Sequence, residues 1–240
     1  MTKEPNPTPA RSHADHHTDV SGGWLRAATF GGMDGLVSNI GLIAGVGGGG
    51  VAPGAIVLAG IAGLIAGAIS MAFGEYTSVK TQNEAIEREV ARERAELIRN
   101  PEGEAAELAQ MWIDRGISAD VARQMAQALK DRPDEALRFH VQEELGVSAI
   151  EKPSPWVAGG SSFVTFSIGA LIPLLPYLFG STSLWLALGV GGVGLVIAGT
   201  LASRFTHRPW WYGAGRQLLL GTVAAAATYA IGLMIGTGLA

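Results

Sequence analysis

GAISMAFGEYTSVK, residues 67–80, joins an apolar helix to charged sequence. The apolar run that it completes, residues 54–74, has no charged side chain. At about 1.5 Å of rise per residue, such a run crosses a hydrocarbon layer of about 30 Å. The helical pattern then continues through charged residues to about Arg99. One long helix is therefore predicted to leave a membrane and continue into water.

Four further apolar runs, residues 24–46, 155–178, 183–203 and 218–239, have comparable lengths. The 34 glycines lie mostly inside such runs, which is typical of closely packed membrane helices. We therefore predict an all-α, polytopic membrane protein with five transmembrane helices and an inserted helical domain. The predicted division is a disordered polar tail (1–22), spans one and two (23–74), the insert (75–152) and spans three to five (153–240).

The predicted insert differs in composition from the rest of the chain. It contains 17 of the 21 acidic residues and 11 of the 17 Lys and Arg residues. Asn100 and Pro101 form a helix-starting pair, Gly116 ends that helix, Ser118 starts another, and Pro133 starts a third. This punctuation predicts a helical domain outside the membrane.

Basic residues predict the orientation. Arg204, Arg208 and Arg216 flank the fourth and fifth runs, whereas the turns at 47–53 and 180–182 have no Lys or Arg. The positive-inside rule then places the amino terminus and the insert in the cytosol. With no cysteine, thiolate metal sites and disulfides are excluded, and a net charge of −4 argues against a nucleic-acid partner.

Three possible metal ligands occupy the first two runs. Asp34 lies inside the first run, where an acid costs about 2.5–3.5 kcal/mol to insert and usually has a function. Counted from the short turn between the runs, Asp34 reaches the depth of Gly67, with Met71 and Glu75 one and two turns nearer the cytosol. Oxygen and thioether ligands together favour a transition metal such as Fe²⁺ or Mn²⁺. The alternatives are a local backbone cap for Asp34, packing for Met71 and an interfacial acid for Glu75.

The insert has acidic pairs at i, i+3 spacing, which places both carboxylates of a pair on one helix face. A third group includes a histidine. Solvated helix faces paired with Arg92, Arg94 and Arg99 are the alternative explanation. The candidate metal ligands are Glu93, Glu96, Glu104, Glu107, His140, Glu143 and Glu144.

Several enzyme signatures are absent. No E-x-x-H or H-E-x-x-H motif occurs, and G-x-G-x-x-G at 189–194 lies inside an apolar run, which excludes a dinucleotide site there. We therefore predict no enzymatic activity. The His-rich stretch at 13–17 is a weaker metal candidate than the insert, and a flexible tail is its favoured interpretation.

The chain resembles the vacuolar iron transporter family. The resemblance rests on DGLVSNIGLIAGV (34–46), AGAISMAFGEYTSVKTQNE (66–84), EELGV (143–147) and FVTFSIGALIPLLP (163–176). It implies a five-span homodimer that moves Fe²⁺ or Mn²⁺ out of the cytosol in exchange for protons. Asp34, Met71 and Glu75 match pore positions, and the insert acids match a metal-binding domain. Phe139 and His140 stand where characterised members have methionines, and an imidazole also suits Zn²⁺.

The predicted function is therefore divalent metal export by proton antiport, with the metal as cargo and no tightly bound cofactor. The expected partners are the lipid bilayer, metal ions, protons and a second copy of the chain. The membrane is the plasma membrane in a prokaryote and a vacuolar-type membrane otherwise. A membrane-anchored metal sensor and a ferroxidase-like protein are the alternatives.

Overall fold

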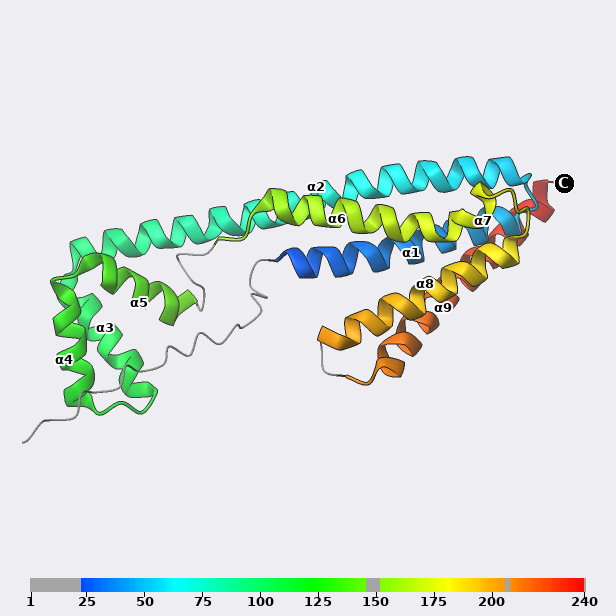
Figure 1. The fold of residues 1–240 in the computed structure, drawn as a ribbon. Helices are drawn as coiled ribbons and strands as arrows, with labels where there is room; N and C mark the ends of the chain where they lie inside the picture. Colours follow the sequence, from blue (N-terminus) through cyan, green and yellow to red (C-terminus); the bar gives the residue numbers. More distant parts are fainter. Residues whose placement is uncertain (1–22, 146–151, 206–207, 240) are drawn as a thin grey trace, which may run out of the picture.

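The computed structural model describes residues 23–145, 152–205 and 208–239, and within these ranges every regular element is a helix. The longest is α2 (Pro53–Arg99), a single 47-residue helix that links the apolar bundle to the insert (Figure 1). Pro53 occupies the start of α2, where the missing N–H of proline has no helical partner to lose. The prediction that the second apolar helix continues to about Arg99 is confirmed.

The first half of α2 lies at the edge of a bundle that also contains α1 (Trp24–Gly48), α6 (Pro155–Leu171), α8 (Leu184–Phe205) and α9 (Trp210–Leu239). A 3₁₀ turn, η1 (Ile172–Leu174), and the short α7 (Leu175–Leu178) continue α6. Pro173 and Pro176 lie in this continuation. Because proline cannot donate an i→i−4 hydrogen bond, the regular α-helix gives way there.

Four segments are long and apolar enough to cross a membrane: Pro53–Arg99, Pro155–Leu178, Leu184–Arg204 and Trp210–Thr237. Helix α1 has 25 residues, which is also sufficient length, but Arg26, Asp34 and Asn39 lower its hydropathy. By length and composition, the described residues thus contain four candidate spans, whereas the sequence predicted five. Helix α1 nevertheless runs along α6 inside the bundle (Figure 1).

Glycines set how closely the bundle helices approach. A Cβ added at Gly35 would collide with the backbone carbonyl of Phe166 in α6, and one at Gly169 would collide with Gly32 in α1. On the other side of α1, a Cβ at Gly232 of α9 would collide with Gly45. The prediction that the spaced glycines allow close helix contact is confirmed at these crossings.

The insert forms three short helices at the far end of α2: α3 (Pro101–Asp114), α4 (Ala119–Lys130) and α5 (Pro133–Leu145) (Figure 1). Asn100 ends α2, and its Oδ1 accepts a hydrogen bond from the Gly103 amide at 3.2 Å. The core of the insert is apolar and small. It comprises Leu108, Ala109, Trp112, Ala122 and Ala126.

One boundary differs from the prediction. The apolar pattern predicts the last helix over 218–239, whereas α9 begins at Trp210, directly after Pro209. Backbone contact between Gly213 and Gly199 of α8 holds these first turns against the bundle, so packing extends a helix that apolar periodicity alone would start later. The predicted tail (1–22) and the end of the insert (146–151) lie outside the described residues.

Candidate functional site

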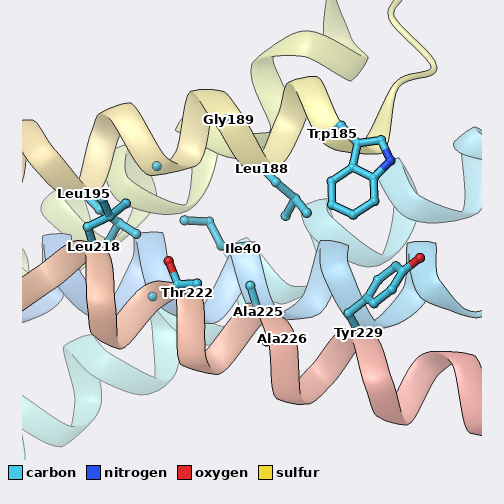
Figure 2. A pocket seen from close by; sticks show the side chains of 12 residues that line it. Ile40, Trp185, Leu188, Gly189, Leu195, Leu218, Thr222, Ala225, Ala226 and Tyr229 are labelled. Atoms are coloured by element: carbon cyan, nitrogen blue, oxygen red, sulfur yellow. The ribbon is translucent and has the colours of Figure 1, made fainter.

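Two pockets among the described residues are apolar. One of about 400 Å³ lies between α1, α8 and α9, where Ile40, Trp185 and Tyr229 line it together with small residues (Figure 2). The other, of about 380 Å³, lies between α1, α6 and α8. Neither lining includes an acidic, histidine or cysteine side chain. A third pocket, of about 20 Å³ in the insert, is lined by His140 among mostly apolar residues, so a candidate metal site is sought around that histidine.

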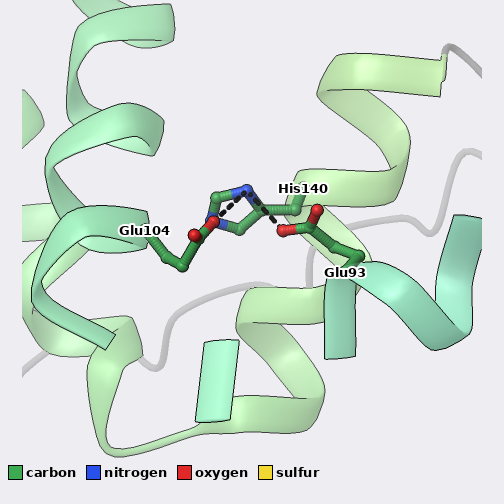
Figure 3. Close-up of side chains that lie close together, drawn as sticks. All are labelled: Glu93, Glu104 and His140. Carbon is green, nitrogen blue, oxygen red and sulfur yellow. Dashed lines mark ion pairs between the residues drawn. The ribbon is translucent and has the colours of Figure 1, made fainter. Parts of the chain in front are cut away.

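Three potential ligands converge in the insert. They are Glu93 in α2, Glu104 in the first turn of α3 and His140 in α5 (Figure 3). Each offers one ligand atom, and these atoms all lie within 4.8 Å of one another. Nδ1 of His140 is 3.0 Å from Oε1 of Glu93 and 4.0 Å from Oε2 of Glu104. All three side chains are buried, and only 1% of His140 is exposed.

The local fold explains this convergence. The break at Asn100 turns the chain back, so that α3 presents Glu104 toward the end of α2 that holds Glu93. Helix α5 packs against α2, and its Phe139 meets Trp112 of α3 edge to face, with 5.8 Å between ring centroids. His140 follows Phe139 directly and enters the space between the two glutamates.

The chemistry of this cluster suits a divalent cation. Burying carboxylates is costly unless a cation or a proton compensates them. Carboxylate oxygen and imidazole nitrogen are ligands that Fe²⁺, Mn²⁺ and Zn²⁺ accept. Three protein donors also leave coordination positions open, so that an ion held here can be exchanged.

Of the other predicted insert ligands, Glu96, Glu107 and Glu143 lie outside this group. Arg92 and Arg99 contact Glu96, with nitrogen–oxygen distances of 3.2 and 3.8 Å. The hydrogen bond to Glu96, and then its charge, raise the pKa of Arg92. Glu107 is exposed and Glu143 forms an ion pair with Arg115. The side chain of Glu144 lies outside the described residues. The structure thus brings together three of the seven predicted insert ligands.

In the bundle, two contacts fix the register of the antiparallel pair α1 and α2. A Cβ added at Gly63 would lie 3.8 Å from Oδ1 of Asn39, and Nη2 of Arg26 lies 2.7 Å from Oε2 of Glu75. Asp34, between Arg26 and Asn39, therefore lies at the depth of Gly67, as the length of the turn predicts. Met71 and Glu75 follow one and two turns nearer the insert.

The three predicted pore residues have different surroundings. Asp34 is half-buried and accepts a hydrogen bond from Ser38 at 2.9 Å. Phe30, Asp34 and Ser38 are spaced by four residues, which puts them on one stripe of α1, and Phe30 and Ser38 are exposed. Met71 packs beside Phe166 of α6. The side chain of Glu75 is 8% exposed and ion-paired with Arg26.

Comparison with known proteins places this arrangement in a family. The chain matches the VIT family over residues 25–233, which is most of its length. It belongs to the VIT family. The resemblance predicted from the motifs is thus confirmed.

Among similar proteins, vacuolar iron transporter 1 of Oryza sativa subsp. japonica is 33% identical over 238 residues, covering 95% of this chain and 93% of that protein. The vacuolar iron transporter of Acanthamoeba castellanii is 35% identical over 224 residues, with 90% and 80% covered. Vacuolar iron transporter 1 of Arabidopsis thaliana is 32% identical over 230 residues, with 92% and 91% covered. Membership of this transporter family confirms the expectation that the chain is a multi-pass membrane protein and not an enzyme.

Some polar contacts of this VIT-family chain were missed by sequence reasoning. Arg26 stands at the edge of the first apolar run, and the apolar pattern does not mark it as the ion-pair partner of Glu75. Met33 stands beside Asp34 in sequence, but its sulfur lies 2.6 Å from Nε2 of the buried Gln217 in α9. The antiparallel register of α1 and α2 could have predicted this ion pair, because it sets Arg26, within one turn of the start of α1, opposite Glu75.

Proposed function

We propose that the chain carries Fe²⁺ and Mn²⁺ out of the cytosol, in exchange for protons. The relatives are named vacuolar iron transporters, which supports iron as a cargo. Manganese is proposed from ligand chemistry, because carboxylate oxygens suit Mn²⁺. The metal is the substrate and not a resident cofactor.

The observation that carries this proposal is the continuity of α2. The same helix holds the buried Glu93 of the insert and the buried Glu75 of the bundle. They are 18 positions apart, which makes five turns and about 27 Å of rise, so the two carboxylates lie on the same helix face. Beyond the exposed Glu84, Glu87 and Glu89, an ion released by the insert group thus has its next buried carboxylate, Glu75, on the same face of α2.

Within the bundle, the proposed route runs from Glu75 past Met71 to Asp34. Metal binding requires the deprotonated carboxylates, so a proton that arrives at Asp34 or Glu75 from the far side competes with the metal and releases it. This competition for shared carboxylates is the proposed basis of antiport. The outer insert acids Glu96, Glu107, Glu143 and Glu144 are proposed to attract the cation toward the buried group.

We propose that α1 is the fifth span and that two copies of the chain pair. The stripe with Phe30, Asp34 and Ser38 stays uncovered in a single chain, which is unfavourable for an acid facing lipid. A two-fold axis beside this stripe would cover Asp34 and double the ligands along the route. Five spans then place the amino terminus and the insert in the cytosol, in agreement with the arginines flanking α8 and α9.

The test is metal flux into proteoliposomes that contain a metal-sensitive dye, with and without an imposed pH gradient. We expect Fe²⁺ and Mn²⁺ uptake that rises when the lumen is acidic. Asp34→Asn should reduce uptake at least tenfold, whereas Ser167→Ala, which removes a hydroxyl of α6 that donates only to the Phe163 carbonyl of its own helix, should retain it. Wild-type uptake in Asp34→Asn would refute the route. Absent uptake together with intact metal binding would favour a metal sensor.

A further inference from the structure

The ion pair between Arg26 and Glu75 lies where cargo must enter the proposed route. We propose that Arg26 is a tethered counter-ion for Glu75. Its guanidinium occupies the carboxylate when no metal is present, and an incoming cation must displace it. The inference rests on the proposed function, because it assigns Glu75 to the metal route, and it adds a residue that sets affinity and charge selectivity there.

The two partners of this pair differ strongly in exposure. The side chain of Glu75 is 8% exposed, whereas that of Arg26 is 63% exposed, although Nη2 and Oε2 are only 2.7 Å apart. The carboxylate is therefore fixed inside the bundle, and the cation reaches it from solvent. Arg26 can return to water with little desolvation cost, whereas Glu75 cannot leave.

Packing around Glu75 explains why its carboxylate needs a compensating cation whenever it is ionised. Ala27, Val79 and Ala158 form a buried cluster where α1, α2 and α6 meet, next to Arg26 and one turn from Glu75. An enclosed carboxylate without a compensating partner is strongly unfavourable. In the described part of the chain, Arg26 is the one basic side chain within ion-pair distance of it.

Displacement gives a reason for charge selectivity. The guanidinium carries one charge and makes a charge-assisted hydrogen bond, so a monovalent cation gains little by replacing it. A divalent cation brings twice the charge to the same carboxylate and competes more effectively. Arg26 lies eight residues before Asp34, about 12 Å along α1. This competition therefore acts only at the cytosolic end of the route, where the metal enters.

The test is equilibrium binding of Mn²⁺ to the full-length protein in nanodiscs, with free Mn²⁺ counted by electron paramagnetic resonance. Binding at Glu75 is the difference between each protein and the same protein with Glu75→Gln. In Arg26→Gln we expect this Glu75-dependent binding to tighten about fivefold, which is about 1 kcal/mol at 1.4 kcal/mol per tenfold. We also expect 150 mM K⁺, present at roughly cytosolic level, to compete more effectively in this variant than in wild type.

A second variant protects the test against misfolding. Arg26→Lys keeps the charge but loses the planar fork of donors, so its affinity should fall between wild type and Arg26→Gln. Tightening is a result that structural damage would not produce. Unchanged or weaker Glu75-dependent binding in either variant overturns the proposal, as does wild-type protein with no such binding.

Flux measured in parallel separates the two claims. If wild-type vesicles take up metal but Arg26→Gln does not tighten binding, the transport proposal stands and the counter-ion proposal fails. If binding tightens as expected but no protein supports flux, Arg26 competes at a binding site and the transport proposal fails.

Discussion

Glu104→Gln tests the buried ligand group of the insert, because it keeps the side-chain shape and removes one carboxylate. The ligand atoms of Glu93 and Glu104 lie within 4.8 Å of each other. Two ionised carboxylates at that separation repel by about 3.5 kcal/mol at an effective dielectric constant of about 20. Glutamine relieves this repulsion but weakens the 4.0 Å contact with His140, so the stability of the metal-free insert should change little. Metal affinity should fall about 100-fold, since losing an outer-shell partner alone costs about 10–100-fold.

Hydrogen exchange measures this change in the full-length protein. At a free metal concentration of about 100 times the wild-type Kd, binding stabilises the insert by about 2.7 kcal/mol and slows exchange through local opening by about 100-fold. The same concentration equals the Kd of a variant that binds 100-fold more weakly. Its stabilisation is then about 0.4 kcal/mol, and exchange slows only about twofold. Peptides from α3 and α5 report the difference, with Mn²⁺ as the ion.

Glu102→Gln is the matched control. Glu102 lies on the same turn of α3, is exposed and pairs with Lys130, so the same substitution there should leave the metal effect near 100-fold. Full metal protection in Glu104→Gln would refute the assignment of the buried group. Equal losses in both variants would show that general acidity, and not the enclosed cluster, holds the ion.

Two further predictions concern packing and pH. Gly35→Ala should destabilise the protein by about 1–3 kcal/mol in a thermal unfolding assay, because its Cβ would collide with the Phe166 backbone. Gly160→Ala should not destabilise it, because a Cβ there meets open space. Equal losses in the two variants would contradict the conclusion that glycine is required where α1 crosses α6. A hydrogen bond from Lys152, and then its charge, lower the pKa of the exposed Glu87 below its ordinary 4.5. The stabilisation it brings is therefore present above about pH 4.5 and is lost as the pH falls through the lowered pKa. In Lys152→Met the pKa of Glu87 should rise toward its ordinary value, which NMR of the labelled carboxyl group measures. An unchanged pKa would exclude the ion pair between Lys152 and Glu87.

Sequence reasoning worked where the physical signal is local. The charge-free run before Glu75 and the uninterrupted helical pattern after it were enough to predict α2 across the boundary between bundle and insert. Asn100 and Pro101 were enough to place the start of α3, because capping depends on neighbouring residues only. The short turn after α1 was enough to set the depth of Asp34 relative to Gly67.

Choosing among equivalent acids required tertiary structure. Glu93 and Glu96 have the same spacing as Glu104 and Glu107, so the sequence treats all four alike. In the fold, the first member of each pair turns toward His140, whereas Glu96 meets arginines and Glu107 faces solvent. Helical periodicity fixes which residues share a face, but it does not say which face another helix will cover.

The sequence by itself thus determined the apolar helices, their antiparallel pairing and the types of ligand available, because these follow from hydropathy, turn length and side-chain chemistry. Only the tertiary structure decided that His140 contacts both Glu93 and Glu104, and that Arg26 forms an ion pair with Glu75. Both contacts join residues 36 or more positions apart across different helices. They depend on how glycine-lined helices cross, and that is a property of packing that no local pattern contains.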